Sequence, residues 1–347
     1  MARKQRSKGT GSIYQNARGQ WVATIEAGWT ERGTRRRHTL KARTEREVRG
    51  RLAEAHRRIA AEGLIASFAS ITVKRWADQW LAGRQRVVRP GTYVSDRSAV
   101  NRWIVPTIGH LRLDALVPAD VRKVASAQEA AGLALPTMQR THAVLGKILT
   151  DAVAEGYQVS SRARETGGPG TGPSSRQALS TDDAMRIIAT IAQRPDVSRW
   201  VAALVEGLRP AEALGLTWDM VDLDAATMAL AWQLKALPYV ERRSPASGFR
   251  VPRGFESRHL VGTYHLVRPK TRAGIRVVPM VPWLAEALAT WQGCAPSSPF
   301  NLVWPREDGA PRSAEFDRAQ WYEIVDQAGV IVTLPGGATR RPLLYEA

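Results

Sequence analysis

The stretch at residues 206–224, EGLRPAEALGLTWDMVDLD, places an arginine, a proline and a glutamate close together. Pro210 favours the first position of a helix, because its missing N–H is not needed there. Arg209 is then the cap residue, beside backbone N–H groups that have no partner within the helix. A guanidinium at such a helix start can hold a phosphate, and Glu212 can brace the guanidinium or complete the cap. This motif alone leaves two interpretations open: an anion site, or a surface arginine beside a capping glutamate.

A second basic segment, TYHLVRPKTRAGIRVVPM, follows at residues 263–280. Its β-branched residues predict two strands, 263–268 and 275–280, joined by a tight turn with Lys270 at its start. A hairpin tip can carry one ammonium into a DNA groove, where a lysine can act as a general acid. Arg272 in the same turn is a candidate for DNA contact. The alternative is an ordinary solvated turn.

The net charge of the chain indicates a polyanionic partner. The 347 residues carry a formal charge of +18, and the first 62 residues contribute +10 of it, from 16 Lys and Arg against 6 acids. Nucleic acid is the commonest soluble polyanion, so double-stranded DNA is the expected partner. A membrane surface is the weaker alternative.

Cysteine and histidine usage predicts chemistry without a metal or cofactor. The one cysteine, Cys294, excludes an intrachain disulfide and a cysteine-based zinc site, and the six histidines show no metal-ligand spacing. No window approaches the roughly 20 apolar residues of a spanning helix. The basic N-terminus lacks the apolar core of a signal peptide, so we expect a cytoplasmic protein without a membrane partner.

The N-terminal region, residues 1–65, predicts a small sheet followed by a helix. Alternating residues and glycine turns predict strands at 12–15, 20–27 and 34–40, and a Thr-x-x-Glu capping box at Thr44 opens a helix that stops at Gly63. A sheet of this size can enter a DNA groove, although a basic solubilising tail is the alternative. The candidate DNA-binding residues here are Arg18, Trp21, Arg35, Arg36, Arg37 and Lys41.

The remainder predicts a multidomain chain that is mainly α with small β-sheets. Residues 70–160 have helical periodicity interrupted by Gly and Pro, which indicates a four-helix unit with Arg97 and Arg102 as candidate phosphate contacts. Residues 161–177 are rich in Gly, Pro, Ser and Thr and predict a flexible linker. A mixed α+β domain then occupies residues 178–347, and its segment 235–262 predicts an extended, Arg-rich connection.

In this order, the segments resemble the tyrosine recombinases, in particular the lambda-type phage integrases with three domains. The sheet and helix of residues 1–65 resemble the arm-type DNA-binding domain, and residues 70–160 resemble the core-type DNA-binding domain. The pair GLRPAEALGLTWDMVDLD and PKTRAGIRVVP resembles the start of the catalytic domain. The resemblance covers almost the whole chain.

The resemblance implies site-specific DNA recombination and integration without metal or ATP. A tyrosine attacks the phosphodiester, which gives a 3′-phosphotyrosyl intermediate and then strand exchange. By this likeness Arg209 stabilises charge on the scissile phosphate, Glu212 supports it, and Lys270 protonates the leaving 5′ oxygen. The implied partners are core-type and arm-type DNA sites and further copies of the chain, as a homotetramer on DNA.

The family pattern continues with a His-x-x-Arg helix, a His or Trp and a late tyrosine, and no such series follows Lys270 here. The one match, His265 to Arg268, precedes Lys270 in a predicted strand, where residues three apart point to opposite faces. Tyr345 and Tyr322 are not expected to be the nucleophile. We therefore expect a C-terminally incomplete catalytic domain that binds DNA without cleaving it.

Two alternatives remain open on the sequence. A non-catalytic DNA-binding protein could use the same domains to occupy attachment sites or to regulate a full-length recombinase. An unrelated basic helical protein that binds RNA is the other alternative, although no RNA-reading motif is recognisable. Covalent trapping on DNA distinguishes the recombinase from the first alternative.

Overall fold

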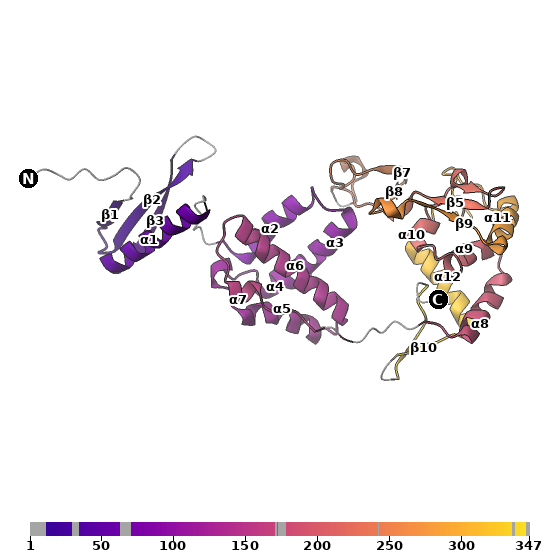
Figure 1. The fold of residues 1–347 in the computed structure, drawn as a ribbon, viewed down its shortest axis with the longest axis horizontal. Coiled ribbons are helices and arrows are strands. Elements are labelled where there is room, and N and C mark those ends of the chain that lie inside the picture. The colour runs from indigo at the N-terminus through magenta and orange to yellow at the C-terminus, as the bar shows by residue number, and fades with distance from the viewer. Residues whose placement is uncertain are drawn as a thin grey trace, which may run out of the picture. The chain divides into compact units, whose positions relative to one another are not determined.

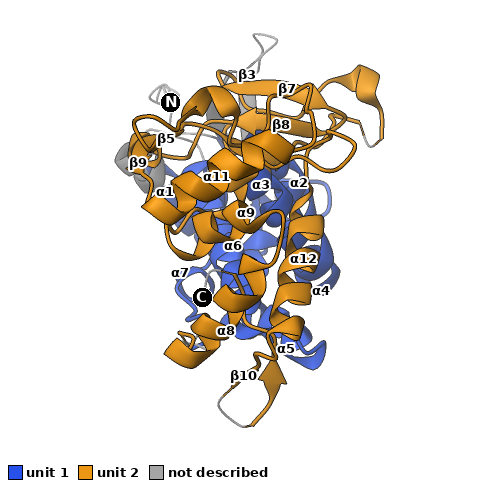
Figure 2. Ribbon diagram, turned by 90° about the vertical axis from the view of Figure 1, so that its right-hand side faces the viewer, with its two compact units in different colours: residues 1–84, 91–171 blue, residues 85–90, 172–347 orange. Residues whose placement is uncertain are grey.

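The computed structural model describes residues 12–29, 35–62, 71–170, 172, 178–241, 243–334 and 337–344. The chain divides into two compact units (Figure 2). One comprises residues 1–84 and 91–171, and the other comprises residues 85–90 and 172–347. Within the described residues, no helix combines the length and the apolar character that crossing a membrane requires.

The N-terminal elements are an antiparallel sheet in the order β1-β2-β3 and a helix (Figure 1). Their bounds are β1 Ser12–Gln15, β2 Trp21–Trp29, β3 Arg35–Ala42 and α1 Glu45–Glu62. The predicted strands and helix are confirmed, with slightly shifted ends. Ala23, Ile25 and Ala42 of the sheet pack against Val48 and Leu52 of α1, which gives this region its own small core.

The helices of residues 71–170 confirm the predicted helical unit. Indole N–H groups join α2 to α6: Trp76 donates to the Ile148 carbonyl at 2.9 Å and Trp80 to Asp151 Oδ2 at 2.8 Å. A helical turn, α7, occupies the start of the segment predicted to be a flexible linker. The elements are α2 Val73–Arg84, α3 Pro90–Ala99, a π-helical stretch Val100–Ile104, α4 Val105–Ile108, α5 Pro118–Ala130, α6 Leu135–Ala154 and α7 Ser161–Arg164.

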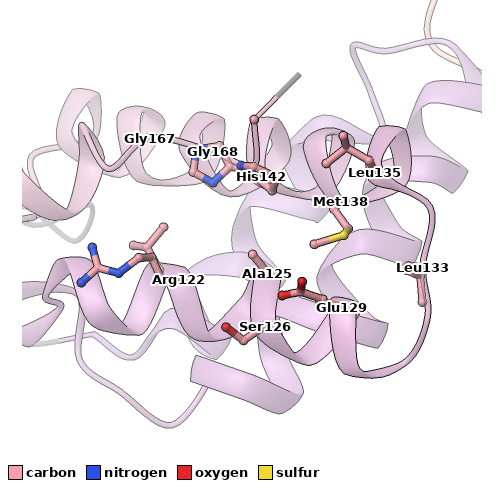
Figure 3. Close-up of a pocket in the computed structure, with 13 residues that line it drawn as sticks. Arg122, Ala125, Ser126, Glu129, Leu133, Leu135, Met138, His142, Gly167 and Gly168 are labelled. Atoms are coloured by element: carbon pink, nitrogen blue, oxygen red, sulfur yellow. The ribbon is translucent and has the colours of Figure 1, made fainter. Parts of the chain in front are cut away.

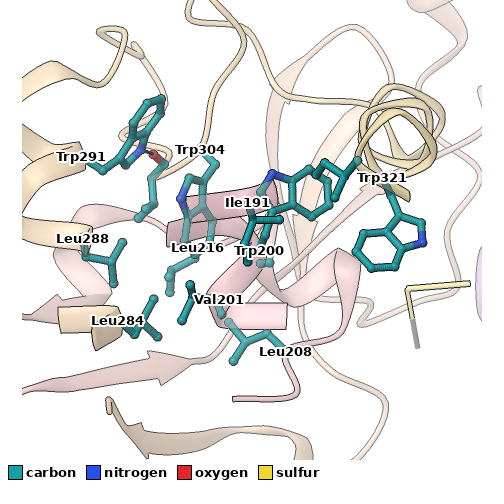
Figure 4. Close-up of a cluster of buried hydrophobic side chains, with 14 of the residues drawn as sticks. Ile191, Trp200, Val201, Leu208, Leu216, Leu284, Leu288, Trp291, Trp304 and Trp321 are labelled. Atoms are coloured by element: carbon teal, nitrogen blue, oxygen red, sulfur yellow. Dashed lines mark hydrogen bonds between the residues drawn. The ribbon is translucent and has the colours of Figure 1, made fainter. Parts of the chain in front are cut away.

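The second unit is built around a cluster of buried tryptophans and aliphatic residues (Figure 4). Each of three core indoles has a partner for its N–H: Trp291 donates to the Val303 carbonyl, Trp304 to Ser198 Oγ and Trp321 to the Pro342 carbonyl. The surrounding helices are α8 Thr181–Ala192, α9 Val197–Leu204, α10 Pro210–Ala213, α11 Pro282–Cys294 and α12 Ala314–Gln327.

Two antiparallel three-stranded sheets of this unit have the orders β4-β5-β9 and β6-β8-β7. The prediction that 263–268 and 275–280 form one hairpin is wrong, because β8 pairs with β6 and β7 whereas β9 pairs with β5. The Lys270 segment is thus a connection between two sheets. The strands are β4 Val221–Asp222, β5 Thr227–Leu230, β6 Gln233–Ala236, β7 Ser257–Val261, β8 Tyr264–Val267, β9 Arg276–Pro279, and a separate pair, β10 Val332–Thr333 and β11 Thr339–Arg340.

The helix that begins at Pro210, as predicted, is only four residues long. It ends at Ala213, and Leu214 and Gly215 turn away toward β6. A Cβ at Gly215 would lie 2.6 Å from the backbone nitrogen of Leu234, so only glycine permits this approach. The close contact brings the Arg209 segment directly against the β6-β8-β7 sheet.

Candidate functional site

The segment that carries Arg209 leaves α9 through a glycine turn. Gly207 has φ +64°, a conformation that glycine adopts without strain, and the Leu208 N–H returns to the Ala202 carbonyl at 3.0 Å. Arg209 then has extended backbone angles at the cap position, and Pro210 is the first helical residue, as predicted. The Glu212 N–H donates to the Arg209 carbonyl at 2.9 Å and is therefore not available to an anion. The guanidinium of Arg209 is the principal hydrogen-bond donor that an anion can meet here.

The carboxylate of Glu212 is the centre of the site. Its side chain is 1% exposed and accepts hydrogen bonds from two arginines. From Arg209, Nη1 donates to Oε1 at 2.9 Å and the backbone N–H donates to Oε2 at 3.2 Å. From Arg276, Nη2 donates to Oε2 at 3.0 Å and Nη1 to Oε1 at 3.3 Å. The predicted brace between Glu212 and Arg209 is therefore present, with a second arginine added.

The two arginines keep the buried carboxylate ionised. Burial by itself raises the pKa of Glu212, because a charged group loses hydration. The hydrogen bonds from Arg276 and Arg209 favour the charged form more strongly, and together they hold the pKa of Glu212 below its ordinary value. Glu212 is thus a fixed negative charge that orients the guanidinium groups around it.

The exposure of the two guanidinium groups differs. The Arg209 side chain is 69% exposed, whereas that of Arg276 is 32% exposed. One terminal nitrogen of Arg209, Nη1, donates to Glu212. The other N–H groups of this exposed guanidinium remain available to a phosphate. The arrangement can therefore fix an anion at Arg209, while the half-buried Arg276 supports the carboxylate from its other side.

Arg276 is a site residue that the sequence analysis did not single out. It lies on β9, and its Nη1 also approaches the Gly274 carbonyl at 3.4 Å. Through Glu212 and Gly274, Arg276 links the Arg209 segment to the connection that carries Lys270. The sequence offered one signal for Arg276: it is the second arginine of the motif PKTRAGIRVVP and directly precedes a run of strand residues.

Lys270 and Arg272 lie in the connection between β8 and β9, and both are exposed. A short 3-10 helix, Arg272–Gly274, shapes this connection, and a Cβ at Gly274 would lie 2.6 Å from Pro269 Cβ. Among the described residues, Lys270 has no hydrogen-bond partner, so its ammonium is free to meet a ligand. The motif around Arg209 and the motif around Lys270 thus lie in the same compact unit.

The candidate residues of the N-terminal sheet are placed as follows. Tyr14, Val22 and Lys41 form one cross-strand row, on the face opposite the row that packs against α1. Lys41 is exposed there, and Arg18 is exposed in the turn between β1 and β2. The half-buried Trp21 packs against the α1 core instead. Arg35, Arg36 and Arg37 belong to the backbone of β3, but their side chains fall outside the described part of the structure.

The helical unit presents Arg97 on α3 and Arg102 on the following π-helical stretch, and both are exposed. Arg97 lies over the ring of Tyr93 at 5.8 Å. A cavity of about 550 Å³ between α5, α6 and residues 167–170 is lined by Met138, His142 and neighbouring residues (Figure 3). No cluster of His, Cys, Asp or Glu suited to a metal ion occurs among the residues that the structure describes.

Comparisons with known proteins agree with this architecture. Residues 72–127 match the family described as phage integrase, N-terminal SAM-like domain. An integrase of Streptomyces ambofaciens is 27% identical over 227 residues, covering 63% of this chain and 57% of the relative. An integrase of Saccharopolyspora erythraea is 23% identical over 271 residues, covering 77% of this chain and 59% of the relative. The chain thus spans less than two thirds of the length of both relatives.

Solved integrase structures share the fold. The Tn1549 transposon integrase, in complex with a circular intermediate DNA, aligns with a TM-score of 0.61 at 17% identity, over 75% of this chain and 79% of that one. A lambda integrase tetramer bound to a Holliday junction aligns with a TM-score of 0.55 at 14% identity, over 99% and 86%. The chain therefore has the multidomain, mainly α fold of these integrases. The resemblance to the lambda-type integrases of the tyrosine recombinase family is confirmed.

Proposed function

We propose that this chain belongs to a site-specific recombination system and acts on double-stranded DNA as a phage-type integrase. The observation that carries the proposal is the buried Glu212 carboxylate, which holds the exposed Arg209 guanidinium and the Arg276 guanidinium in hydrogen-bonding geometry. A guanidinium held in this way is prepared for a phosphodiester oxygen before any DNA arrives. The integrase relatives and the shared fold support the same conclusion.

The residues of this chain have distinct proposed roles in the reaction. Arg209 binds a non-bridging oxygen of the scissile phosphate and stabilises the charge that develops there, while Glu212 positions Arg209. A tyrosine oxygen attacks phosphorus, the bond to the 5′ oxygen breaks, and Lys270 gives its proton to that leaving oxygen. The product is a 3′-phosphotyrosyl link, which a second DNA 5′ hydroxyl later resolves.

We propose further that these 347 residues, taken by themselves, bind DNA without cleaving it. They contain Arg209, Glu212 and Lys270 but no His-x-x-Arg after Lys270, and the resemblance implies that these groups act as a set. Because such sets are strongly non-additive, a part of one retains little turnover. Occupation of attachment sites, or regulation of a full-length recombinase, is the activity that then remains to these residues.

Different segments of the chain have different proposed roles on DNA. Residues 1–65 contact arm-type sites through the face of the β1-β2-β3 sheet that carries the exposed Lys41. Residues 70–160 contact core-type sites through exposed arginines such as Arg97 and Arg102. Residues 161–177 serve as the linker, and residues 178–347 provide the catalytic-type surface. Assembly as a homotetramer on DNA is proposed by analogy with the lambda integrase structure.

Binding and covalent trapping test the proposal together. The 347-residue protein is used to select sites from a random duplex library, and nicked copies of the selected sites are then incubated with it. We expect salt-sensitive binding that Arg209→Ala weakens. The control variant, Arg318→Ala on α12, should bind as the wild type does. No covalent DNA-protein band should appear on a denaturing gel. A covalent band would overturn the proposal that these residues do not cleave, and absence of DNA binding would overturn the function itself.

A further inference from the structure

Residues 237–256, here named the arch, form a folded loop between β6 and β7. Its two limbs are joined by backbone hydrogen bonds, from the Val240 N–H to the Gly248 carbonyl at 3.0 Å and from the Arg250 N–H to the Pro238 carbonyl at 2.8 Å. The Ser247 hydroxyl accepts from the Glu241 N–H at 3.0 Å. The sequence predicted an extended connection, whereas the described residues of the arch fold back on themselves.

Aromatic side chains attach the arch to the sheet. The rings of Tyr239 and Phe249 stack with centroids 5.0 Å apart, and the rings of Phe249 and His265 are nearly perpendicular with centroids 4.2 Å apart. Phe249 also lies 5.2 Å from His259, which is paired with His265 across β7 and β8. The arch is therefore fixed on one face of the β6-β8-β7 sheet. A ligand that binds it meets a loop that is already ordered, which lowers the entropic cost of binding.

The arch and the adjoining strands carry an excess of positive charge. Residues 235–262 hold 6 basic and 2 acidic side chains. Arg243, Arg253 and Arg258 are exposed, and none of the three has an ion-pair partner among the described residues. Of the two acids, Glu256 is already paired with Arg268 at 2.9 Å. The positive charge of this surface thus lacks local compensation.

Arg258 is held in place by an aromatic ring. Its guanidinium carbon lies 4.3 Å from the centroid of the Trp232 ring, and that of Arg268 lies 3.9 Å from the same centroid. Stacking on an indole orients the plane of a guanidinium while leaving its N–H edge available for a phosphate. Arg258 is therefore both exposed and pre-oriented, and it lies on the edge strand of the sheet, on the face opposite to His259 and the arch.

The position of this surface relates it to the candidate site. β7 pairs with β8, and β8 ends at Val267, shortly before Lys270. Figure 1 shows β7 and β8 together at the end of the second unit opposite α11. The basic surface thus borders the strand that leads into the Lys270 connection.

We infer that the arch and β7 form an additional contact to the DNA sugar-phosphate backbone, made by Arg243, Arg253 and Arg258 next to the Lys270 connection. This inference rests on the proposed function, because it assigns a further surface to the same DNA. The recognised chemistry is a row of phosphates, so the contact adds affinity and fixes orientation without reading base sequence.

The test measures binding of the full chain to a random-sequence duplex over a range of salt concentrations. The triple variant Arg243→Gln, Arg253→Gln, Arg258→Gln is compared with the control Arg306→Gln, Arg318→Gln, Arg341→Gln, which removes the same charge from exposed positions elsewhere in the second unit. Each phosphate contact contributes about 0.9 to the slope of log K against log salt, so the arch variant should have a slope shallower by about 2 to 3. The control should change the slope by less than about 1.

The outcomes separate this inference from the function on which it rests. Equal slopes for the two triple variants, with wild-type binding intact, would overturn the arch contact alone. Failure of the wild-type chain to bind any duplex would overturn the proposed function. The single variant Arg253→Gln, at a residue without a described side-chain contact, covers the case in which the triple variant does not fold. Its slope of log K against log salt should be shallower by about 1. An unchanged slope would contradict the inference.

Discussion

Two buried carboxylates of the second unit are bound by arginine in different ways. Asp317 on α12 accepts both bonds of Arg199 on α9, at 3.1 and 2.6 Å, and the two side chains are 3% and 0% exposed. Glu212 is as deeply buried, but its partner Arg209 is 69% exposed. The first pair is closed to solvent on both sides, whereas the second presents one of its guanidinium groups at the surface.

This difference separates an ion pair that holds the fold from one that prepares a site. The Arg199 guanidinium also lies over the Trp200 ring at 5.1 Å, and its Nη1 has no hydrogen-bond partner in the described part of the chain. No ligand can reach that nitrogen without unfolding the core. At Arg209, by contrast, the unused donors face solvent, so a phosphate can complete them.

The largest expected effect is on the closed pair. Asp317→Ala leaves the Arg199 charge buried without a partner, and should lower the free energy of unfolding by about 3–5 kcal/mol. Urea denaturation measures the free energy of unfolding, and hydrogen exchange of the native variant shows whether α9 and α12 are locally destabilised. Asp326→Ala is the matched control, because its pair with Arg341 is half exposed on both sides and should contribute about 1 kcal/mol or less. Equal losses for the two variants would contradict the structural role of the Arg199–Asp317 pair.

A smaller loss of stability, combined with a loss of DNA binding, is expected at Glu212. Glu212→Gln removes the charge that both arginines bond, and should lower the free energy of unfolding by about 2 kcal/mol. Because Arg209 is then no longer held, affinity for duplex DNA should also fall at constant salt. Denaturation and filter binding of the same preparation measure the two effects. Unchanged affinity in a folded variant would show that Glu212 is only structural.

The pH dependence of stability should distinguish Glu212 from glutamine at that position. The pKa of Glu212 is lowered in the folded protein from the ordinary 4.5. Its stabilising contribution is therefore complete above 4.5 and is lost as the pH falls through the lower folded-state pKa. The difference in unfolding free energy between wild type and Glu212→Gln should shrink over this acid range. A difference that stays constant there would contradict the assigned ion pairs.

The smallest effect on stability is expected at Arg209. Arg209→Ala removes a mostly exposed guanidinium and leaves Arg276 on the carboxylate, so the free energy of unfolding should change by about 1 kcal/mol or less. Duplex affinity should nevertheless fall, and Arg209→Lys should restore only part of it, because lysine cannot make paired bonds to phosphate. A large loss of stability with intact DNA binding would show that the Arg209–Glu212 pair holds the fold, as the Arg199–Asp317 pair does, and does not prepare a site.

Local features of the site could be predicted from the sequence. Pro210 fixed the start of α10, and the spacing of Arg209 and Glu212 placed a carboxylate beside a guanidinium, because both depend on residues a few positions apart. The length of α10 could not be predicted, since its early end depends on the approach of Gly215 to β6. That approach is a tertiary contact, and helix propensity does not encode it.

Longer-range features of the site were missed for the same reason. Two β-branched segments on either side of a Gly-containing turn are typical of a hairpin. Instead, β9 pairs with β5, tens of residues earlier, and β8 lies between the distant β6 and the adjacent β7. The contact between Arg276 and Glu212 likewise joins residues far apart in the sequence. A single sequence shows which residues are charged but not which distant carboxylate will accept their bonds.

The placement of Lys270 between two sheets has a consequence for how this unit tolerates sequence change. The connection is anchored at one end by the pairing of β8 with β6 and β7, and at the other by the pairing of β9 with β5. The arch joins β6 to β7, which are the two strands that flank β8. Its length can therefore vary by insertion or deletion while the Lys270 connection keeps its anchors, so that the proposed DNA contacts at the arch can diversify independently of the proposed site at Arg209 and Lys270.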